Sequence, residues 1–138
     1  MNYQIEVIYD GKLRTTAKHL SSNEIIITDA PKDNQGEGQF FSPTDMVATA
    51  LASCMLTIMG ITANSQNINI DGTNAKVKKV MGENPRKIKE IHLQIEFLYR
   101  INEKQKKILE RAAHLCPVSK SLSSDIKKNI TFKYSDES

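Results

Sequence analysis

The segment that begins at Ser42 places the tightest constraint on the fold. From 46 to 61 the residues are predominantly apolar, and Thr49, Ser53 and Thr57 interrupt the run. A membrane span needs ~20 consecutive apolar residues, so this run is too short and too interrupted to cross a bilayer. The sequence therefore predicts a buried helix of a soluble protein and no membrane partner.

The residues that precede this run form a helix start signal. Ser42 can cap the helix, Pro43 suits its first turn, and Asp45 favours the positive end of the helix dipole. We expect the helix to run to about Asn64. It is apolar nearly all the way round, which places it in the middle of the fold. Its many small residues allow other backbones to approach closely.

The flanking segments alternate between apolar and polar residues, as strands do. Before the helix we expect strands at 3–9, 13–20 and 25–28, with a hairpin turn at Asp10-Gly11 and a loop over 29–38. After it we expect two or three strands within 68–99, with a turn at 82–85, then a helix capped by Asn102 that reaches Cys116. Pro117 ends or kinks that helix, a short turn follows within 118–125, and the last strand covers 130–134. Strands grouped as hairpins predict an α+β fold with antiparallel sheets, and the length fits a single domain, 1–138.

Charge and motif content exclude several function classes. The net charge of +3 is spread along the chain, and the basic runs at 76–79 and 104–107 are typical of solvated faces, so no nucleic-acid partner is expected. The three histidines are widely spaced, which is unlike a metal site. The loop around Gly36 and Gly38 lacks the lysine of a phosphate-binding loop, and no bound cofactor is expected.

Two cysteines, Cys54 and Cys116, are the residues with the most chemical potential. The chain start does not resemble a signal peptide, so we expect a reducing cytoplasm, where a permanent disulfide is uncommon. Each thiol is then either a small core residue or a reactive group. Cys54 lies among apolar residues that would raise its pKa, so it needs a positive partner to react. Cys116 precedes Pro117, where a new helical turn can offer free backbone N–H groups.

The contexts of both cysteines resemble one known family. The stretch from Ser42 to Cys54, SPTDMVATALASC, resembles the first cysteine motif of the OsmC family, which includes osmotically inducible protein C and the organic hydroperoxide resistance proteins. The stretch from Ala112 to Ser119, AAHLCPVS, resembles its second motif, in which a proline follows the cysteine. The resemblance covers nearly the whole chain, in element order as well as in motifs.

This resemblance implies a thiol-dependent peroxidase that reduces organic hydroperoxides and folds as an intertwined homodimer, with two active sites at the subunit interface. Cys54 would be the residue that attacks the peroxide, and Cys116 would resolve the resulting sulfenic acid to a disulfide. Arg14 matches the family's arginine, which holds the thiolate and polarises the peroxide. The implied electron donor is an external dithiol, of which a lipoyl-type dithiol is one example, with no bound cofactor.

The sequence departs from the peroxidases at one position. Where they have a glutamate that orients the arginine, this chain has Thr44, followed by Asp45. Either Asp45 substitutes for the glutamate, or Arg14 is held less firmly. The Ser-Pro-x-Asp pattern is similar to that of a further group within the family. Two alternatives therefore stay open: a protein that binds a small ligand or senses redox state without turnover, and a purely structural role for both cysteines.

Overall fold

The computed structural model describes residues 1–135 and confirms the predicted α+β class. The described residues form two three-stranded sheets with helices. They gather in two compact units, Met1–Val47 and the chain from Ala48 onward, and we describe each unit by itself. The single domain over 1–138 stays a prediction.

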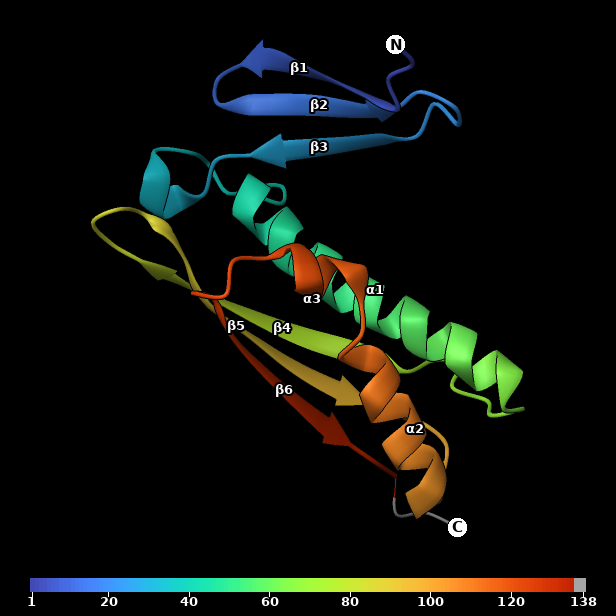
Figure 1. Cartoon of the computed structure of the whole chain (residues 1–138). Helices are drawn as coiled ribbons and strands as arrows, with labels where there is room; N and C mark the ends of the chain where they lie inside the picture. The colour runs from blue at the N-terminus through green and yellow to red at the C-terminus, as the bar shows by residue number, and fades with distance from the viewer. Residues whose placement is uncertain (136–138) are drawn as a thin grey trace. The chain divides into compact units, whose positions relative to one another are not determined.

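The N-terminal unit contains an antiparallel sheet in the order β1-β2-β3 (Figure 1). Its strands are β1 Ile5–Gly11, β2 Arg14–His19 and β3 Ile25–Asp29. The first hairpin turns at Lys12 and Leu13, whose φ angles are 55° and 64°, and not at the predicted Asp10-Gly11. Gly11 pairs with Arg14 after a bulge, so the turn lies two residues later than the Asp-Gly signal indicated. This shift makes Arg14 the first residue of β2.

The segment at the end of β3 and after it is also more ordered than the sequence indicated. The predicted loop began at Asp29, but Asp29 is the last residue of β3, and a short 3₁₀ helix, η1 Lys32–Asn34, follows it. The backbone N–H of Asp29 donates to the carbonyl of Phe41, and that of Ala30 donates to the carbonyl of Leu13. These bonds tie the loop to the sheet at the end where Arg14 begins β2.

Helix α1 spans Pro43–Ser65 and starts as predicted. The Ser42 hydroxyl accepts the backbone N–H of Asp45 at 3.0 Å, and the Asp45 carboxylate accepts the N–H of Ser42 at 3.0 Å. This reciprocal pair is a capping box with aspartate at the third position. The helix is long and apolar enough to cross a membrane by composition, a test that the core helices of soluble proteins also pass.

The second unit contains a sheet in the order β4-β5-β6, with β4 Asn74–Gly82, β5 Lys87–Glu96 and β6 Lys127–Lys133 (Figure 1). β4 and β5 pair antiparallel, as expected. β6 pairs parallel to β5, which differs from the predicted all-antiparallel arrangement. A parallel neighbour requires a crossover connection, and the two helices between β5 and β6 provide it.

Those helices are α2 Glu103–Ala113 and α3 Pro117–Ser121. Asn102 caps α2 as predicted: its side chain accepts the N–H of Gln105 at 2.8 Å, and the Gln105 side chain accepts the N–H of Asn102 at 3.3 Å. α2 ends at Ala113, so Cys116 does not lie on it as the sequence indicated. Cys116 is instead the residue that caps α3.

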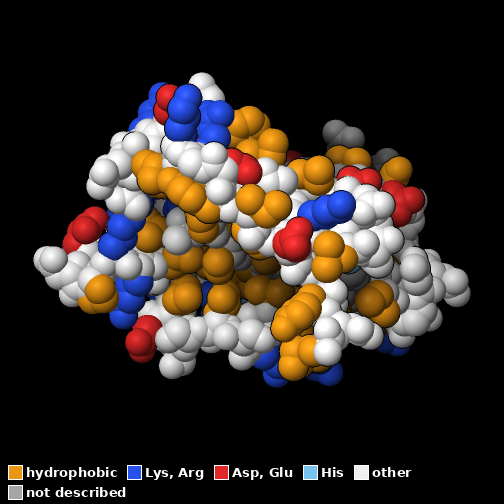
Figure 2. Space-filling model, turned by 90° about the horizontal axis from the view of Figure 1, so that it is seen from above, with side chains coloured by type: hydrophobic (Ala, Val, Ile, Leu, Met, Phe, Trp, Pro, Cys, Tyr) orange, Lys and Arg blue, Asp and Glu red, His pale blue; other side chains and the backbone are white. Residues whose placement is uncertain are grey.

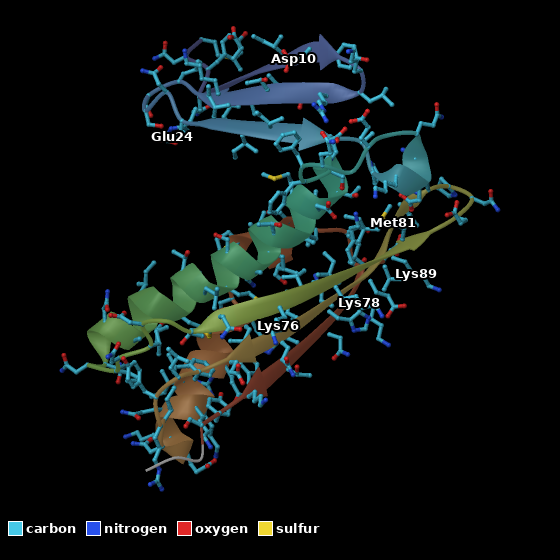
Figure 3. All side chains as sticks on the ribbon, turned by 180° about the vertical axis from the view of Figure 1, so that it is seen from behind. Asp10, Glu24, Lys76, Lys78, Met81 and Lys89 are labelled. Carbon is cyan, nitrogen blue, oxygen red and sulfur yellow. The ribbon has the colours of Figure 1, made fainter. Side chains whose placement is uncertain are left out.

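The core of this unit lies between the sheet and the helices on one of its faces (Figure 1). Alternate residues of β5 point into it, and Ile91, Leu93 and Ile95 are at most 2% exposed. The helices contribute Leu51, Met55, Met59, Leu109, Ala112 and Ala113. The other face of the sheet carries Lys76 and Lys78 of β4 (Figure 3). They pair in register with Gln94 and His92 of β5. Both lysines are exposed, as expected for a solvated basic run.

The capping box of α2 yields the first testable prediction. Asn102→Ala removes the acceptor for the N–H of Gln105, which we expect to lower the free energy of unfolding by about 1 kcal/mol. Urea denaturation at a fixed protein concentration measures the change. Lys104 is an exposed residue two positions after Asn102, and Lys104→Ala is the matched control. It should change the free energy of unfolding by less than ~0.5 kcal/mol. Equal effects of the two substitutions would contradict the capping role.

Candidate active site

Cys54 lies on α1 beside the face that packs into the core. Its neighbours Leu51 and Met55 are buried, at 0% and 1% exposed, while Ser53 is exposed. Cys54 itself is half-buried and free of any disulfide. The helix thus holds this sulfur at the border between core and surface, which is where a reactive thiol must be if a substrate is to reach it.

Cys116 lies in the short segment between α2 and α3 and is completely buried. It has extended backbone geometry, and its sulfur accepts the backbone N–H of Ser119 at 3.2 Å, so the side chain caps α3. The Cys116 thiol is also hydrogen-bonded to Cys54. The structure therefore brings the two cysteines together, as the sequence predicted, although 61 residues separate them along the chain (116 − 54 − 1).

The surroundings of Cys116 favour its neutral form. Burial raises the pKa of the Cys116 thiol above its ordinary value, the N–H groups of Ser119 and Val118 oppose this, and the hydrogen bond to Cys54 raises the pKa further. Cys116 is therefore held as a neutral thiol beside Cys54.

Arg14 belongs to the N-terminal unit, where it is the centre of a polar cluster. Its guanidinium hydrogen-bonds to the side chains of Gln39 and Glu37, the latter at 3.3 Å, and lies 3.5 Å from the Asp29 carboxylate. It also lies over the ring of Phe40, 5.2 Å from the centroid. About a third of the side chain is exposed. The sequence indicated the arginine but none of these four partners.

Asp29 is the most unusual member of this cluster. It is 1% exposed, its Oδ2 accepts the backbone N–H of Gln39 at 2.9 Å, and its Oδ1 is buried without a hydrogen-bond partner among the described residues. A buried carboxylate is costly unless a cation pairs with it, and Arg14 is the cation opposite it in the strand register. No sequence signal marked Asp29, because an aspartate at the end of a strand is usually a solvated turn residue.

The histidines contact ordinary polar and aromatic side chains and do not lie together. His92 lies on the outer face of the second sheet, 2.9 Å from Glu90 and 3.2 Å from Asn129. Within residues 1–135, no three side chains of the metal-ligating types gather closely enough to hold a metal ion.

Comparison with known proteins places these features in one family. The family model described as OsmC-like protein matches residues 36–131. A crystal structure from Psychrobacter arcticus 273-4, named for an osmotic stress induced and detoxification response, is 50% identical, with 96% of both chains covered and a TM-score of 0.93. No curated protein matches the chain significantly.

More distant structures share the fold. An OsmC-like protein from Mycoplasma pneumoniae is 22% identical, with 97% of both chains covered and a TM-score of 0.81. The organic hydroperoxide resistance protein OsmC from Legionella pneumophila is 15% identical, with 94% of both chains covered and a TM-score of 0.74.

The environment of Cys116 leads to a prediction for its alkylation. In a Cys54→Ser variant, burial still raises the pKa of Cys116. We therefore expect the rate of its reaction with iodoacetamide to reach its midpoint at a higher pH than in an unstructured peptide of residues 112–120. Mass spectrometry of the alkylated protein over pH 6–11 gives the midpoint. A midpoint below that of the peptide would show that the N–H groups of α3 outweigh burial.

Proposed function

Because the chain belongs to the OsmC-like family, we propose that it is a thiol-dependent peroxidase that reduces organic hydroperoxides through Cys54 and Cys116. The observation that supports this most directly is the hydrogen bond between a buried Cys116 and a half-buried Cys54, with neither sulfur in a disulfide. Several structural neighbours are named as organic hydroperoxide resistance proteins.

In the first step Cys54 acts as the nucleophile. Its thiolate attacks the terminal oxygen of the hydroperoxide, the O–O bond breaks, and the alkoxide leaves and takes up a proton to become an alcohol. Cys54 is oxidised to a sulfenic acid and the peroxide is reduced by two electrons. The half-buried position of Cys54 supports this step, because a peroxide can reach a sulfur at the border of the core.

In the second step Cys116 resolves the sulfenic acid. Its sulfur attacks the sulfur of Cys54, an S–S bond forms, the S–O bond breaks, and the hydroxide leaves as water with the proton from Cys116. The sum is two thiols and one hydroperoxide giving one disulfide, one alcohol and one water. An external dithiol, for which a lipoyl-type compound is our candidate, then reduces the disulfide by thiol–disulfide exchange.

Arg14 is our candidate for the cation that holds the Cys54 thiolate and the peroxide. The cluster of Asp29, Glu37 and Gln39 supports this role, since it fixes the guanidinium of a residue that would otherwise be a flexible surface arginine. The carboxylate of Asp45 accepts the N–H of Ser42 in the helix cap. We propose that the carboxylates of Asp29 and Glu37 hold Arg14 in a chain that has Thr44 where the peroxidases have glutamate.

We also propose that the protein is a homodimer. One face of the N-terminal sheet carries Ile5, Val7, Tyr9 and Ile26, which are 47–65% exposed in the single chain, and apolar side chains reach the surface in Figure 2. On α1, exposed Thr49, Ala50, Ser53 and Thr57 form a face of small side chains. An apolar sheet face and a helix face of small residues both favour close contact with another chain, and a second copy is the partner we propose.

We propose that the protein is cytoplasmic. A cytoplasmic site would keep both thiols reduced, as the structure has them. We propose no nucleic-acid and no membrane partner.

The peroxidase proposal predicts steady turnover of cumene hydroperoxide with dihydrolipoate as the donor. Cys54→Ser should reduce the rate to the uncatalysed level, because it removes the nucleophile. Cys116→Ser should still form one sulfenic acid per chain but no intramolecular disulfide. Dimedone trapping with mass spectrometry measures the first product, and loss of free thiol measures the second.

Arg14→Met serves as the second variant in the same assay and should lower the rate of sulfenic acid formation roughly 10²-fold, since a positioned charge on the reacting oxygens is lost. Lys12→Met, two residues away in the hairpin turn and exposed, is its control. A single stoichiometric oxidation without cycling would instead support a redox sensor. Thiols that do not react with peroxide at all would leave both cysteines with a structural role.

The homodimer proposal predicts a sedimentation mass twice that of the single chain at micromolar concentration. Val7→Glu places a charge on the apolar sheet face and should weaken the association at least about 10²-fold. Glu6→Gln, the adjacent residue on the opposite face, should leave it unchanged. A monomeric wild-type protein at all concentrations would exclude the homodimer.

A further inference from the structure

Lys128 occupies an unusual position on β6. It alternates with Ile130 and Phe132, and it pairs in register with Ile91, which is completely buried. Lys128 therefore lies on the face of the sheet that the helices cover, and it is half-buried. A lysine at such a position needs an acceptor for its ammonium group, because a buried charge without one is costly.

The acceptor is in α3. The Nζ of Lys128 donates to the carbonyl oxygen of Ser119 at 3.1 Å. The neighbouring carbonyls of this short helix are used differently: that of Cys116 accepts the N–H of Lys120, and that of Val118 accepts the N–H of Leu122. α3 ends at Ser121, so the carbonyl of Ser119 is one of the helix-end groups that need a partner from outside the helix. Lys128 provides it, and its positive charge suits a helix C-terminus.

α3 has five residues, far fewer than an isolated helix needs to be stable. Two side-chain contacts stabilise it from opposite ends. At its start the sulfur of Cys116 accepts the N–H of Ser119, and at its end Lys128 holds the carbonyl of the same residue. The position of the Cys116 sulfur is therefore coupled, through Ser119, to a lysine on β6.

We propose that Lys128 is a positioning residue that holds the α3 segment so that the sulfur of Cys116 stays beside Cys54. This inference rests on the proposed peroxidase function and adds a residue to its second step. Formation of the sulfenic acid takes place at Cys54, with Arg14 as the proposed cation, and requires no bond to Cys116, so Lys128 has little effect on it. Formation of the disulfide requires Cys116 to reach the oxidised sulfur, so this step depends on Lys128.

The test compares Lys128→Met, Lys128→Arg and Lys127→Met. Lys127 is the adjacent residue, exposed and on the other face of β6, and makes a matched control. In Lys128→Met we expect the amide of Ser119 to exchange its hydrogen about tenfold faster in the reduced protein, by NMR. After a stoichiometric pulse of cumene hydroperoxide, we expect sulfenic acid to form at the wild-type rate and the disulfide to form about tenfold more slowly. Lys128→Arg should restore both rates, and Lys127→Met should change neither.

The two readouts separate this inference from the proposed function. Unchanged exchange at Ser119 in Lys128→Met overturns the positioning role, whether or not the protein reduces peroxides. Faster exchange with an unchanged rate of disulfide formation overturns it as well, because Lys128 would then stabilise α3 without serving the reaction. If the wild-type protein forms no sulfenic acid, the proposed function fails, and the role of Lys128 in resolution fails with it, even where Ser119 exchanges faster.

Discussion

The packing of β5 against the helices is the constraint on which the candidate site depends. Ile91, Leu93 and Ile95 of β5 are almost completely buried. One face of α1, with Leu51, Met55 and Met59, is buried in the same core. Burying these three helix residues fixes the rotation of α1 about its axis. Cys54 directly precedes Met55, so the rotation that buries the methionine leaves the cysteine at the border of the core. The half-buried state of this thiol is a consequence of core packing.

The same constraint determines where Cys116 lies. β6 is parallel to β5, so the chain between them must cross one face of the sheet, and α2 and α3 form that crossover. Cys116 lies at the junction of these two helices. Two cysteines from distant parts of the sequence therefore lie in one helical layer, close enough for a hydrogen bond.

Local signals in the sequence were sufficient for the starts of α1 and α2, but not for the end of α2 before Cys116. The caps at Ser42 and Asn102 involve residues three positions apart, and such short-range patterns are visible without any knowledge of the fold. The parallel pairing of β6 was not predictable in this way, because strand direction depends on the path of the whole connection. The turn at Lys12 and Leu13 was missed because left-handed φ angles are unusual for these residue types.

The polar residues around the site also differ in whether the sequence could have revealed them. The burial of Asp29 results from the bonds that tie its loop to the sheet, and no periodicity in the sequence reveals these. Lys128 could have been recognised, since it shares the period of two with Ile130 and Phe132 and so falls on the apolar face of its strand. A charged residue on such a face is a signal worth following even when no motif contains it.

The parallel pair of β5 and β6 also has a consequence for the order in which the chain folds during synthesis. β6 follows both cysteines in the sequence, so a ribosome exposes Cys54 and then Cys116 before the strand that completes their sheet has emerged. Contacts of such long sequence separation form late, because the entropy of closing a long loop opposes them. Until β6 docks, the hydrogen bond from Lys128 to the carbonyl of Ser119 in α3 cannot form. Both thiols of the nascent polypeptide are therefore synthesised before the strand that supports the segment of Cys116, and that strand ends at residue 133.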